Sequence, residues 1–277
     1  MRTLPSRGVD RPNDAPTSSA ASAVDPSDSA AVLTLFGSIC DRTADLLSAN
    51  EDWSASGERT GQYSLDVAID AACLDMLHGA GFAVLSEESG LTGSTDGDVP
   101  EHLVVVDPLD GSTNAALGLP WCATALCLVS NGVPTVAMVA NLRTGTRYSA
   151  VLGAGAERDG QPIAVGPTSR LADAIIAVNA RPTASFRPAQ YRSMGATALD
   201  IASVAAVDGF DGSLDFDDDR IGVWDYLAAV MIVREAGGVA ADALGRDLVT
   251  LDHDARRRPV TAGSQPLLDE LLAAARS

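Results

Sequence analysis

The stretch that most constrains the fold is 103–114, where an apolar run leads directly into two aspartates. Its first four residues (Leu-Val-Val-Val) are mainly β-branched, which indicates a buried strand. Asp107 and Asp110 follow, and the proline at 108 predicts that the strand ends there, because proline has no N–H to donate. Gly111 allows a tight turn, and the Ser-Thr-Asn run after it is typical of a helix start. Carboxylates beside the free N–H groups of a helix start suit a site for cations and a phosphate. The alternative is that the aspartates only cap a turn between strand and helix.

Length and composition indicate a globular chain with a sizeable core. The 277 residues are 46% hydrophobic, which is enough for one large domain or two packed lobes. Residues 1–28 are rich in Ala, Ser, Pro, Asp and Arg without apolar periodicity, so we expect a disordered leader there. A change of composition at Gly166-Pro167 predicts a boundary between an N-terminal α+β lobe (29–165) and a C-terminal α/β lobe (166–277).

The charge of the chain limits its partners. The net charge is −18, and all 19 basic residues are arginines. We expect neither nucleic acid nor an anionic membrane as a partner, because both need basic patches that neutralise phosphates. No run of about 18 apolar residues and no apolar signal segment occurs, so we expect no transmembrane helix and a cytoplasmic location. The four cysteines form no CxxC pair and the three histidines are isolated, which disfavours a zinc site.

Apolar periodicity predicts a mixed α/β chain without internal repeats. The predicted helices cover 30–47, 65–77, about 195–206, 226–235 and 266–275. The predicted strands cover 82–85, 103–106, 122–129, 133–140, 146–151, 174–178, 212–216, 238–241 and 259–262, with loops at 50–62 and 91–101.

Two further acidic elements follow the pattern of the first. The strand at 82–85 runs into Glu87 and Glu88 before a Ser-Gly turn. Strands adjacent in sequence are often adjacent in space, so these acids are expected to approach Asp107 and Asp110. The third element is Asp225, at the start of the helix over 226–235. A polar loop and a helix N-cap are the alternative interpretations of these two elements.

Converging carboxylates would repel one another strongly without cations. Oxygen ligands without His or Cys indicate Mg²⁺. Two ions bridged by one carboxylate suit hydrolysis of a phosphate ester, in which one ion activates a water and the other stabilises the leaving oxygen. The spacing excludes an EF-hand, because Gly118 occupies its twelfth position, and a P-loop, because the chain has no lysine. Aspartates three apart also disagree with the two-residue spacing of phosphatases that use an aspartyl nucleophile.

Three motifs in order resemble the inositol monophosphatase family of Mg²⁺-dependent, lithium-sensitive sugar phosphatases. They are Leu-Ser-Glu-Glu-Ser-Gly at 85–90, Val-Asp-Pro-Leu-Asp-Gly-Ser-Thr-Asn at 106–114, and the segment from Trp-Asp-Tyr at 224–226 to Arg-Glu-Ala-Gly-Gly at 234–238. The stretches 153–163 and 194–200 match as well, and the resemblance spans about 30–275. It implies alternating α-β-α-β-α layers and a homodimer.

The resemblance also implies a ligand set for two or three Mg²⁺ ions. Glu87, Asp107 and the carbonyl of Leu109 would hold the first ion. Asp107, Asp110 and Asp225 would hold the second, and Glu87 with waters a weaker third.

The remaining roles that the resemblance implies concern water, phosphate and substrate. Ser112, hydrogen-bonded to Asp70, would orient the attacking water, and the amides of Gly111 and Ser112 would bind the phosphate. Glu88 and Thr113 would support the ligands from behind. Contacts to substrate hydroxyls would come from Asp110, Ala196 and Asp218, although an aspartate among three in a row is otherwise typical of a solvated surface.

The predicted activity is hydrolysis of a small polyol or sugar phosphate, with inositol-1-phosphate as the first candidate. The alternatives are histidinol phosphate, fructose 1,6-bisphosphate and 3′-phosphoadenosine 5′-phosphate, or a non-catalytic relative that binds metal or phosphate. The chain departs from the family pattern at 59–63, where a lysine is usual, and at Val67, where a threonine is usual.

Overall fold

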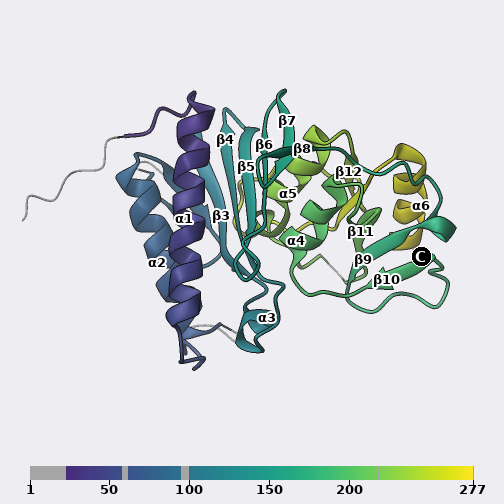
Figure 1. Cartoon of the computed structure of the whole chain (residues 1–277), viewed down its shortest axis with the longest axis horizontal. Coiled ribbons are helices and arrows are strands. Elements are labelled where there is room, and N and C mark those ends of the chain that lie inside the picture. The colour runs from purple at the N-terminus through teal and green to yellow at the C-terminus, as the bar shows by residue number, and fades with distance from the viewer. Residues whose placement is uncertain (1–22, 58–61, 95–99, 218, 277) are drawn as a thin grey trace, which may run out of the picture.

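The computed structural model describes residues 23–57, 62–94, 100–217 and 219–276. Five layers alternate between helix and sheet: α1 with α2, a large sheet, α4 with α5, a small sheet, and α6 (Figure 1). The predicted α/β fold with α-β-α-β-α layers is therefore confirmed.

The large sheet has the strand order β2-β1-β3-β4-β5-β6-β7-β8. In it β1 pairs in parallel with β3, and every other pair is antiparallel. Its strands are β1 (Ala83–Ser86), β2 (Gly90–Thr92), β3 (His102–Asp110), β4 (Ala123–Ser130), β5 (Val133–Asn141), β6 (Arg147–Val151), β7 (Gly155–Arg158) and β8 (Gln161–Ile163).

The small sheet has the order β10-β9-β11-β13-β12 and mixes parallel with antiparallel pairs. Its strands are β9 (Ile175–Asn179), β10 (Gln190–Arg192), β11 (Gly212–Asp215), β12 (Val239–Asp242) and β13 (Pro259–Ala262). The helices are α1 (Ser29–Ala49), α2 (Ser64–Gly79), α3 (Ser112–Ala116), α4 (Thr197–Ala202), α5 (Val223–Glu235) and α6 (Gln265–Ala275), with short 3₁₀ turns at Leu171–Asp173 and Ser203–Ala205.

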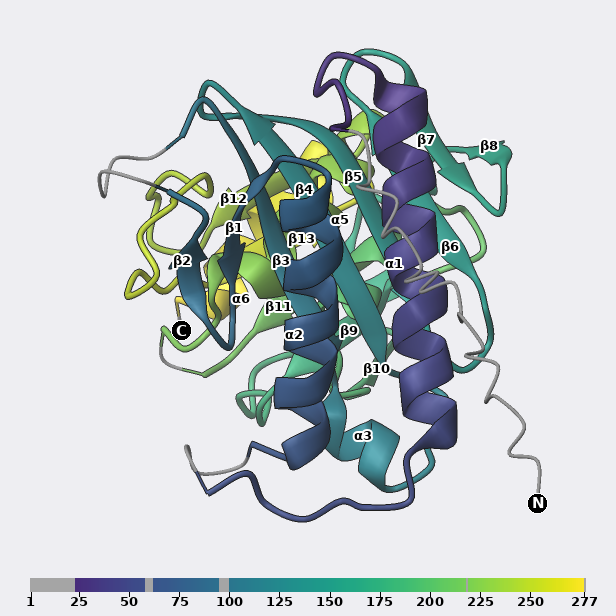
Figure 2. The same ribbon diagram turned by 90° about the vertical axis from the view of Figure 1, so that its left-hand side faces the viewer.

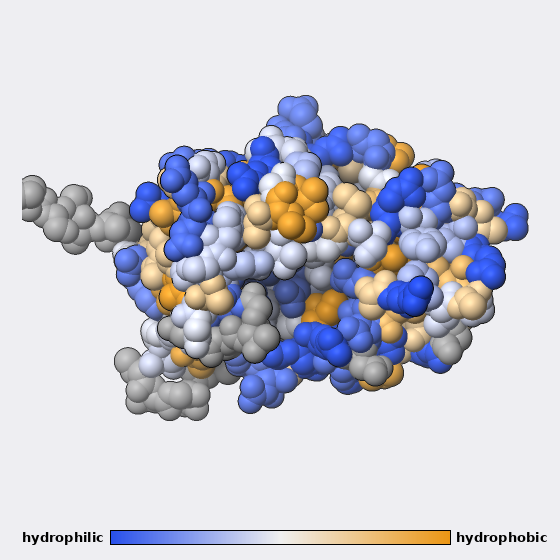
Figure 3. Space-filling model, turned by 90° about the horizontal axis from the view of Figure 1, so that it is seen from below, coloured by the Kyte–Doolittle hydropathy of each residue, from blue (hydrophilic) through white to orange (hydrophobic). Residues whose placement is uncertain are grey.

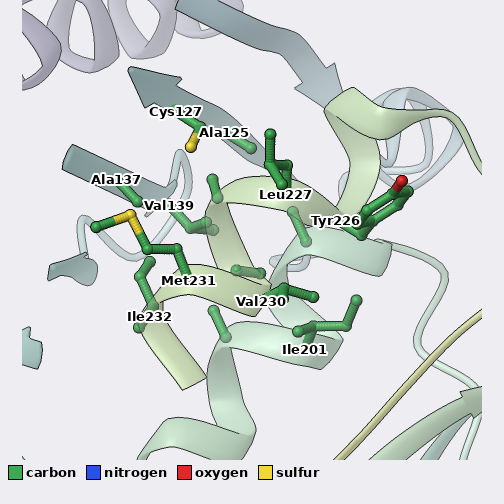
Figure 4. Packing of buried hydrophobic residues seen from close by; sticks show 14 of the residues in the cluster. Ala125, Cys127, Ala137, Val139, Ile201, Tyr226, Leu227, Val230, Met231 and Ile232 are labelled. Carbon is green, nitrogen blue, oxygen red and sulfur yellow. The ribbon is translucent and has the colours of Figure 1, made fainter. Parts of the chain in front are cut away.

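The layers follow from the apolar faces of the helices. Helices α1 and α2 lie side by side across one face of the large sheet (Figure 2), and their buried residues pack against Val104 and Val106 of β3. Helix α5 is apolar nearly all round, which is typical of a helix buried on all sides. It fits between the large sheet and α4: Leu227 and Met231 face the strands, and Val230 faces Ile201 of α4 (Figure 4).

The hydrophobic core around α5 crosses the predicted lobe boundary at 165/166. It includes Leu103 and Val105 of the large sheet together with Leu199 of α4 and Val230 of α5. The two predicted lobes therefore share buried surface between the sheets.

Several local expectations are wrong in detail. Strand β3 does not end at Pro108. It continues to Asp110 through a register shift between Asp107 and Asp110. At this β-bulge the residues between them are not paired with β4, so the missing N–H of Pro108 does not interrupt the sheet. Thr124 Oγ1 donates a hydrogen bond to the carbonyl of Pro108 at 2.8 Å, which satisfies the displaced backbone. Strand β2, which overlaps the loop predicted at 91–101, and strand β10 have only three residues each, too few to show a periodic pattern.

The N-terminal leader predicted for 1–28 lies within the described residues only from Ala23 onward. Val24 donates its backbone N–H to the carbonyl of Ala80 at 2.9 Å, and the side chain of Asp28 accepts a hydrogen bond from the N–H of Ala31 at 3.0 Å. Residues 24–28 thus attach the start of α1 to the turn after α2. No described helix is long and apolar enough to cross a membrane.

Candidate metal centre

Three carboxylates from separate elements meet at one end of the large sheet. Glu87 directly follows β1, Asp107 lies in β3, and Asp225 lies in the first turn of α5. One oxygen from each of these side chains lies within 4.8 Å of the others. The structure thus brings together three of the five predicted metal ligands.

The parallel pair β1/β3 explains why two of these acids coincide. Ser86 is opposite Val106, so the next residues of the two strands, Glu87 and Asp107, lie where the β1/β3 pairing ends, although β3 continues beside β4. The N–H of Glu87 still donates to the carbonyl of Val106 at 3.3 Å, which fixes its backbone. Parallel neighbours bring equivalent strand ends to the same side of a sheet, whereas antiparallel neighbours would separate them.

Asp225 is held by the start of its own helix. Its Oδ2 accepts a hydrogen bond from the N–H of Gly222 at 2.6 Å. Gly222 is the N-cap of α5 and Asp225 is the third residue of the helix, so the predicted N-cap position is wrong, although the carboxylate does bind the helix start. Burial and the charge of Asp110 raise the pKa of Asp225 to about 8. The same carboxylate thus caps α5 and faces the acidic cluster.

Asp107 provides the test of whether a cation fits this cluster. Its side chain is 1% exposed, and its Oδ1 accepts a hydrogen bond from the N–H of Leu109 at 3.0 Å. Within the described part of the chain no group bonds to its buried Oδ2. Burial and the charge of Glu87 raise the pKa of Asp107 well above its usual range. A buried acceptor without a donor, surrounded by carboxylates, fits a divalent cation and oxygen ligation.

Asp110 joins this cluster to the start of α4. Its two oxygens accept hydrogen bonds from the N–H groups of Thr197 at 3.2 Å and Ala198 at 2.7 Å. Burial raises the pKa of Asp110 to about 8 despite these two donors. Asp110 therefore connects the acidic cluster to the first turn of α4.

The turn after β3 is shaped by Gly111. This residue has φ +77° and forms the N-cap of α3, so the predicted capping by the residues after it is wrong. A Cβ at Gly111 would lie 3.0 Å from the Cβ of Ala196 and 3.0 Å from the carbonyl oxygen of Trp121. Asn114 does not cap the helix. Its amide donates to the carbonyls of Trp121 and Met194, both at 2.8 Å.

Ser112 and Thr113 occupy the first turn of α3. Ser112 is half-buried, whereas Thr113 is exposed. Ala196 is buried beside the Gly111 turn. Figure 3 shows the surface from the side on which α3 lies, with a hollow near its middle in a mostly hydrophilic face.

Asp70 contacts different partners from those that the resemblance implies. It is buried in α2, and its two oxygens accept hydrogen bonds from the hydroxyls of Ser86 and Ser89. Among the described residues no hydrogen bond joins Asp70 to Ser112. The two serines flank Glu87, so Asp70 fixes the segment that carries this acid. Glu88, in the same segment, accepts a hydrogen bond from the side-chain amide of Gln62.

Two acids that the motifs did not single out lie beside the site. Asp200 is 2% exposed, and its Oδ1 accepts a hydrogen bond from the indole N–H of Trp121 at 2.8 Å. Burial raises the pKa of Asp200 to about 7. Asp215, at the end of β11, lines with Asp200 and Thr197 a narrow cavity of about 10 Å³, which is roughly the space of one water molecule. The position of Asp215 at the end of a predicted strand was the signal from which the sequence could have identified it. The predicted substrate contact Asp218 lies outside the described residues.

The sequence signature described as "Inositol monophosphatase family" matches residues 62–277. The chain belongs to this family. Among its relatives, the Inositol-1-monophosphatase of Rhizobium meliloti is 34% identical over 178 residues, which are 59% of this chain and 64% of that protein. The Nus factor SuhB of Escherichia coli K12 is 32% identical over 216 residues, 69% of this chain and 75% of that protein. The aligned part thus spans just under two thirds of the Rhizobium protein.

Solved structures of the family share the fold. The extragenic suppressor protein suhB of Bartonella henselae has a TM-score of 0.75 at 25% identity, covering 89% of this chain and 99% of that chain. The inositol monophosphatase of Anabaena has a TM-score of 0.70 at 25% identity, covering 88% and 95%.

Proposed function

We propose that this protein is a Mg²⁺-dependent phosphomonoesterase that hydrolyses a small polyol phosphate, with inositol-1-phosphate as the first candidate. The observation that supports this most directly is the cluster of Glu87, Asp107 and Asp225, whose oxygens lie within 4.8 Å of one another around a buried acceptor. The membership of the family and the name of the Rhizobium relative agree with the proposal.

Glu87, Asp107 and Asp225 would hold the Mg²⁺ ions, with Asp110 and the carbonyl of Leu109 completing the set. Bound Mg²⁺ supplies Lewis acidity that lowers the pKa of a coordinated water and stabilises the leaving oxygen. The protein fixes the ligands in place: Asp110 through the amides at the start of α4, and Asp225 through the N–H of Gly222. Their geometry is thereby set before the substrate binds.

The turn after β3 would bind the phosphate. The N–H groups of Gly111 and Ser112 are the proposed donors to its oxygens, and the hydroxyl of Ser112 is the proposed group that orients the attacking water. Asp70 contributes by holding Ser86 and Ser89 on either side of Glu87. Water is the nucleophile in this proposal, so no phosphoryl group becomes attached to an aspartate.

The residues that open α4 would contact the hydroxyls of the substrate. The predicted contacts are Asp110 and Ala196, and Ala196 is buried beside the Gly111 turn. Inositol-1-phosphate is the first candidate because three motifs of the chain resemble the inositol monophosphatase family and because the Rhizobium relative is named for this activity.

The test is phosphate release by the full-length protein from inositol-1-phosphate, histidinol phosphate, fructose 1,6-bisphosphate and 3′-phosphoadenosine 5′-phosphate, with Mg²⁺ or with a chelator. We expect release with Mg²⁺ only, fastest from inositol-1-phosphate. Fastest release from another ester would change the proposed substrate but would still support a Mg²⁺-dependent phosphomonoesterase. Binding of Mg²⁺ and phosphate without release from any ester would support the non-catalytic alternative.

A further inference from the structure

The ring of His253 contacts the two segments that carry Glu87 and Asp225. Its Nε2 lies 3.2 Å from the carbonyl oxygen of Glu87, 166 residues earlier in the chain. Its ring centroid lies 4.7 Å from that of Trp224, and the two planes are inclined by 33°. Trp224 directly precedes Asp225. One side chain from the loop before β13 thus contacts both sides of the acidic cluster.

The contact with the carbonyl of Glu87 shows which nitrogen of the His253 ring carries a hydrogen. A carbonyl oxygen only accepts hydrogen bonds, so the Nε2 of His253 carries the hydrogen and donates. The ring also rests on β2, because a Cβ at Gly90 would lie 3.7 Å from it. The N–H of Glu87 donates to the carbonyl of Val106, so the backbone of Glu87 is held through both its N–H and its carbonyl.

Arg256 fixes the loop that carries this histidine. Its Nη1 donates to the carbonyls of His253 at 2.6 Å and Ala255 at 3.0 Å. Its guanidinium carbon lies 5.1 Å from the centroid of the Trp224 ring, which is a cation–π contact. His253 and Arg256 therefore both pack on the residue before Asp225.

We propose that His253 is a positioning residue that sets the separation of Glu87 and Asp225 and thereby the metal affinity of the site. The inference rests on the proposed function, because it requires these carboxylates to share bound ions. Metal–ligand distances tolerate only about 0.2 Å. Groups that orient ligands from behind typically change metal affinity or activity about 10- to 100-fold when they are removed.

The structure provides a matched control at the other end of β1. The Nδ1 of His78 lies 3.0 Å from the carbonyl oxygen of Phe82, just before β1 begins. His78→Ala therefore removes the same kind of histidine–carbonyl contact from the same strand, away from the carboxylates. A general loss of stability would affect both alanine variants, whereas a positioning role affects only His253→Ala.

The experiment measures Mn²⁺ and Mg²⁺ affinity by calorimetry, together with the melting temperature in chelator, for the wild type, His253→Ala, His253→Gln and His78→Ala. We expect His253→Ala to raise the apparent Kd about tenfold or more, at an unchanged kcat under saturating Mg²⁺. His253→Gln should restore most of the affinity, because its amide N–H can donate to Glu87. His78→Ala should bind metal like the wild type.

Three outcomes would overturn the inference: unchanged affinity in His253→Ala, equal losses in both alanine variants, or no recovery in His253→Gln. The last outcome would assign the effect to ring packing instead of the hydrogen bond. A wild-type protein that binds no metal would contradict the proposed function itself. A wild type that binds metal no more tightly than His253→Ala contradicts only this inference.

Discussion

Asp107 combines three properties that a structural carboxylate rarely has together. It is almost completely buried, one of its oxygens has no described donor, and two further acids place an oxygen within 4.8 Å. An isolated buried charge costs several kcal/mol, and here the neighbouring charges add to that cost. Such a residue is understandable if it bridges bound cations.

Asp107→Asn tests this residue. The amide is neutral and cannot bridge two cations, so we expect loss of Mg²⁺-dependent thermal stabilisation and a loss of turnover far beyond tenfold. In chelator the variant should melt higher than the wild type, because it removes one of the repelling charges. Differential scanning fluorimetry and phosphate release measure these effects.

Asp173→Asn is the control, because it changes an exposed aspartate in the C-terminal half. It should leave metal dependence and turnover as in the wild type. Turnover of Asp107→Asn within about tenfold of the wild type, which is about 1.4 kcal/mol of activation free energy, would contradict a bridging role.

At the scale of single residues, the sequence could predict those clustered acids that a pattern in the neighbouring residues marks. Glu87, Asp107 and Asp110 follow or end apolar strands, and Asp225 opens an apolar helix. Asp200 gave no such signal, because its carboxylate is buried by packing against Trp121, a contact across 79 residues. The partners of Asp70 were missed for the same reason: hydroxyl orientation depends on tertiary contacts.

At the scale of elements, the turn between β3 and α3 is the most constrained. Gly111 combines a positive φ with close contacts to Ala196 and Trp121. Gly118 has a similar φ of +72°, but no described atom lies within 4 Å of the position that a Cβ would occupy there. Substitution at Gly118 therefore tests backbone strain alone, whereas substitution at Gly111 tests backbone strain together with steric contact.

Gly118→Ala should cost about 1 kcal/mol of unfolding free energy through backbone strain alone. Gly111→Ala should cost about 2–4 kcal/mol, because overpacking adds to the strain, and it should also raise the KM for substrate by displacing the turn. Chemical denaturation and initial-rate kinetics measure both effects. Equal costs for the two variants would show that the contact at Gly111 relaxes easily.

The long elements were predictable because each carries a repeated apolar pattern. The strands expected at 122–129 and 133–140 agree with β4 and β5 to within a residue at each end. The prediction ends β3 too early, because a proline normally stops a strand, whereas a bulge admits it. Whether a β-bulge forms depends on pairing with the neighbouring strand, and the sequence around Pro108 carries no information about that pairing.

At the scale of the whole molecule, the clustered acids make stability depend on pH. The pKa values of Asp110 and Asp225 rise from 3.8 to about 8 on folding, and that of Asp107 also rises. Between about pH 4 and pH 8 the folded state therefore binds more protons than the unfolded state, and stability falls as the pH rises. Acids with lowered pKa values, such as Asp208 and Asp219, titrate below this window.

We therefore expect the melting temperature of the wild type in chelator to fall between about pH 5 and pH 8. Saturating Mg²⁺ should reverse the trend, because it binds the deprotonated carboxylates. Scanning calorimetry across this range, with Asp107→Asn as the comparison, measures the dependence. A melting temperature in chelator that is constant or rises over this range would contradict the proposed cluster.

The layered architecture was predictable from the resemblance and from the order of helices and strands. The continuity of the core across 165/166 was not, because a change in composition indicates a linker without showing what packs beside it. The homodimer and the cytoplasmic location remain predictions.

The central helix has a consequence for how the site is assembled. The first turn of α5 provides Asp225, and the rest of the same helix fills the space between the two sheets. A chain in which only the large sheet has formed would possess Glu87 and Asp107 but lack the third carboxylate of the cluster, Asp225. Under the proposed function, tight binding of ions therefore requires the fully assembled molecule, because Asp225 comes from the second half of the chain.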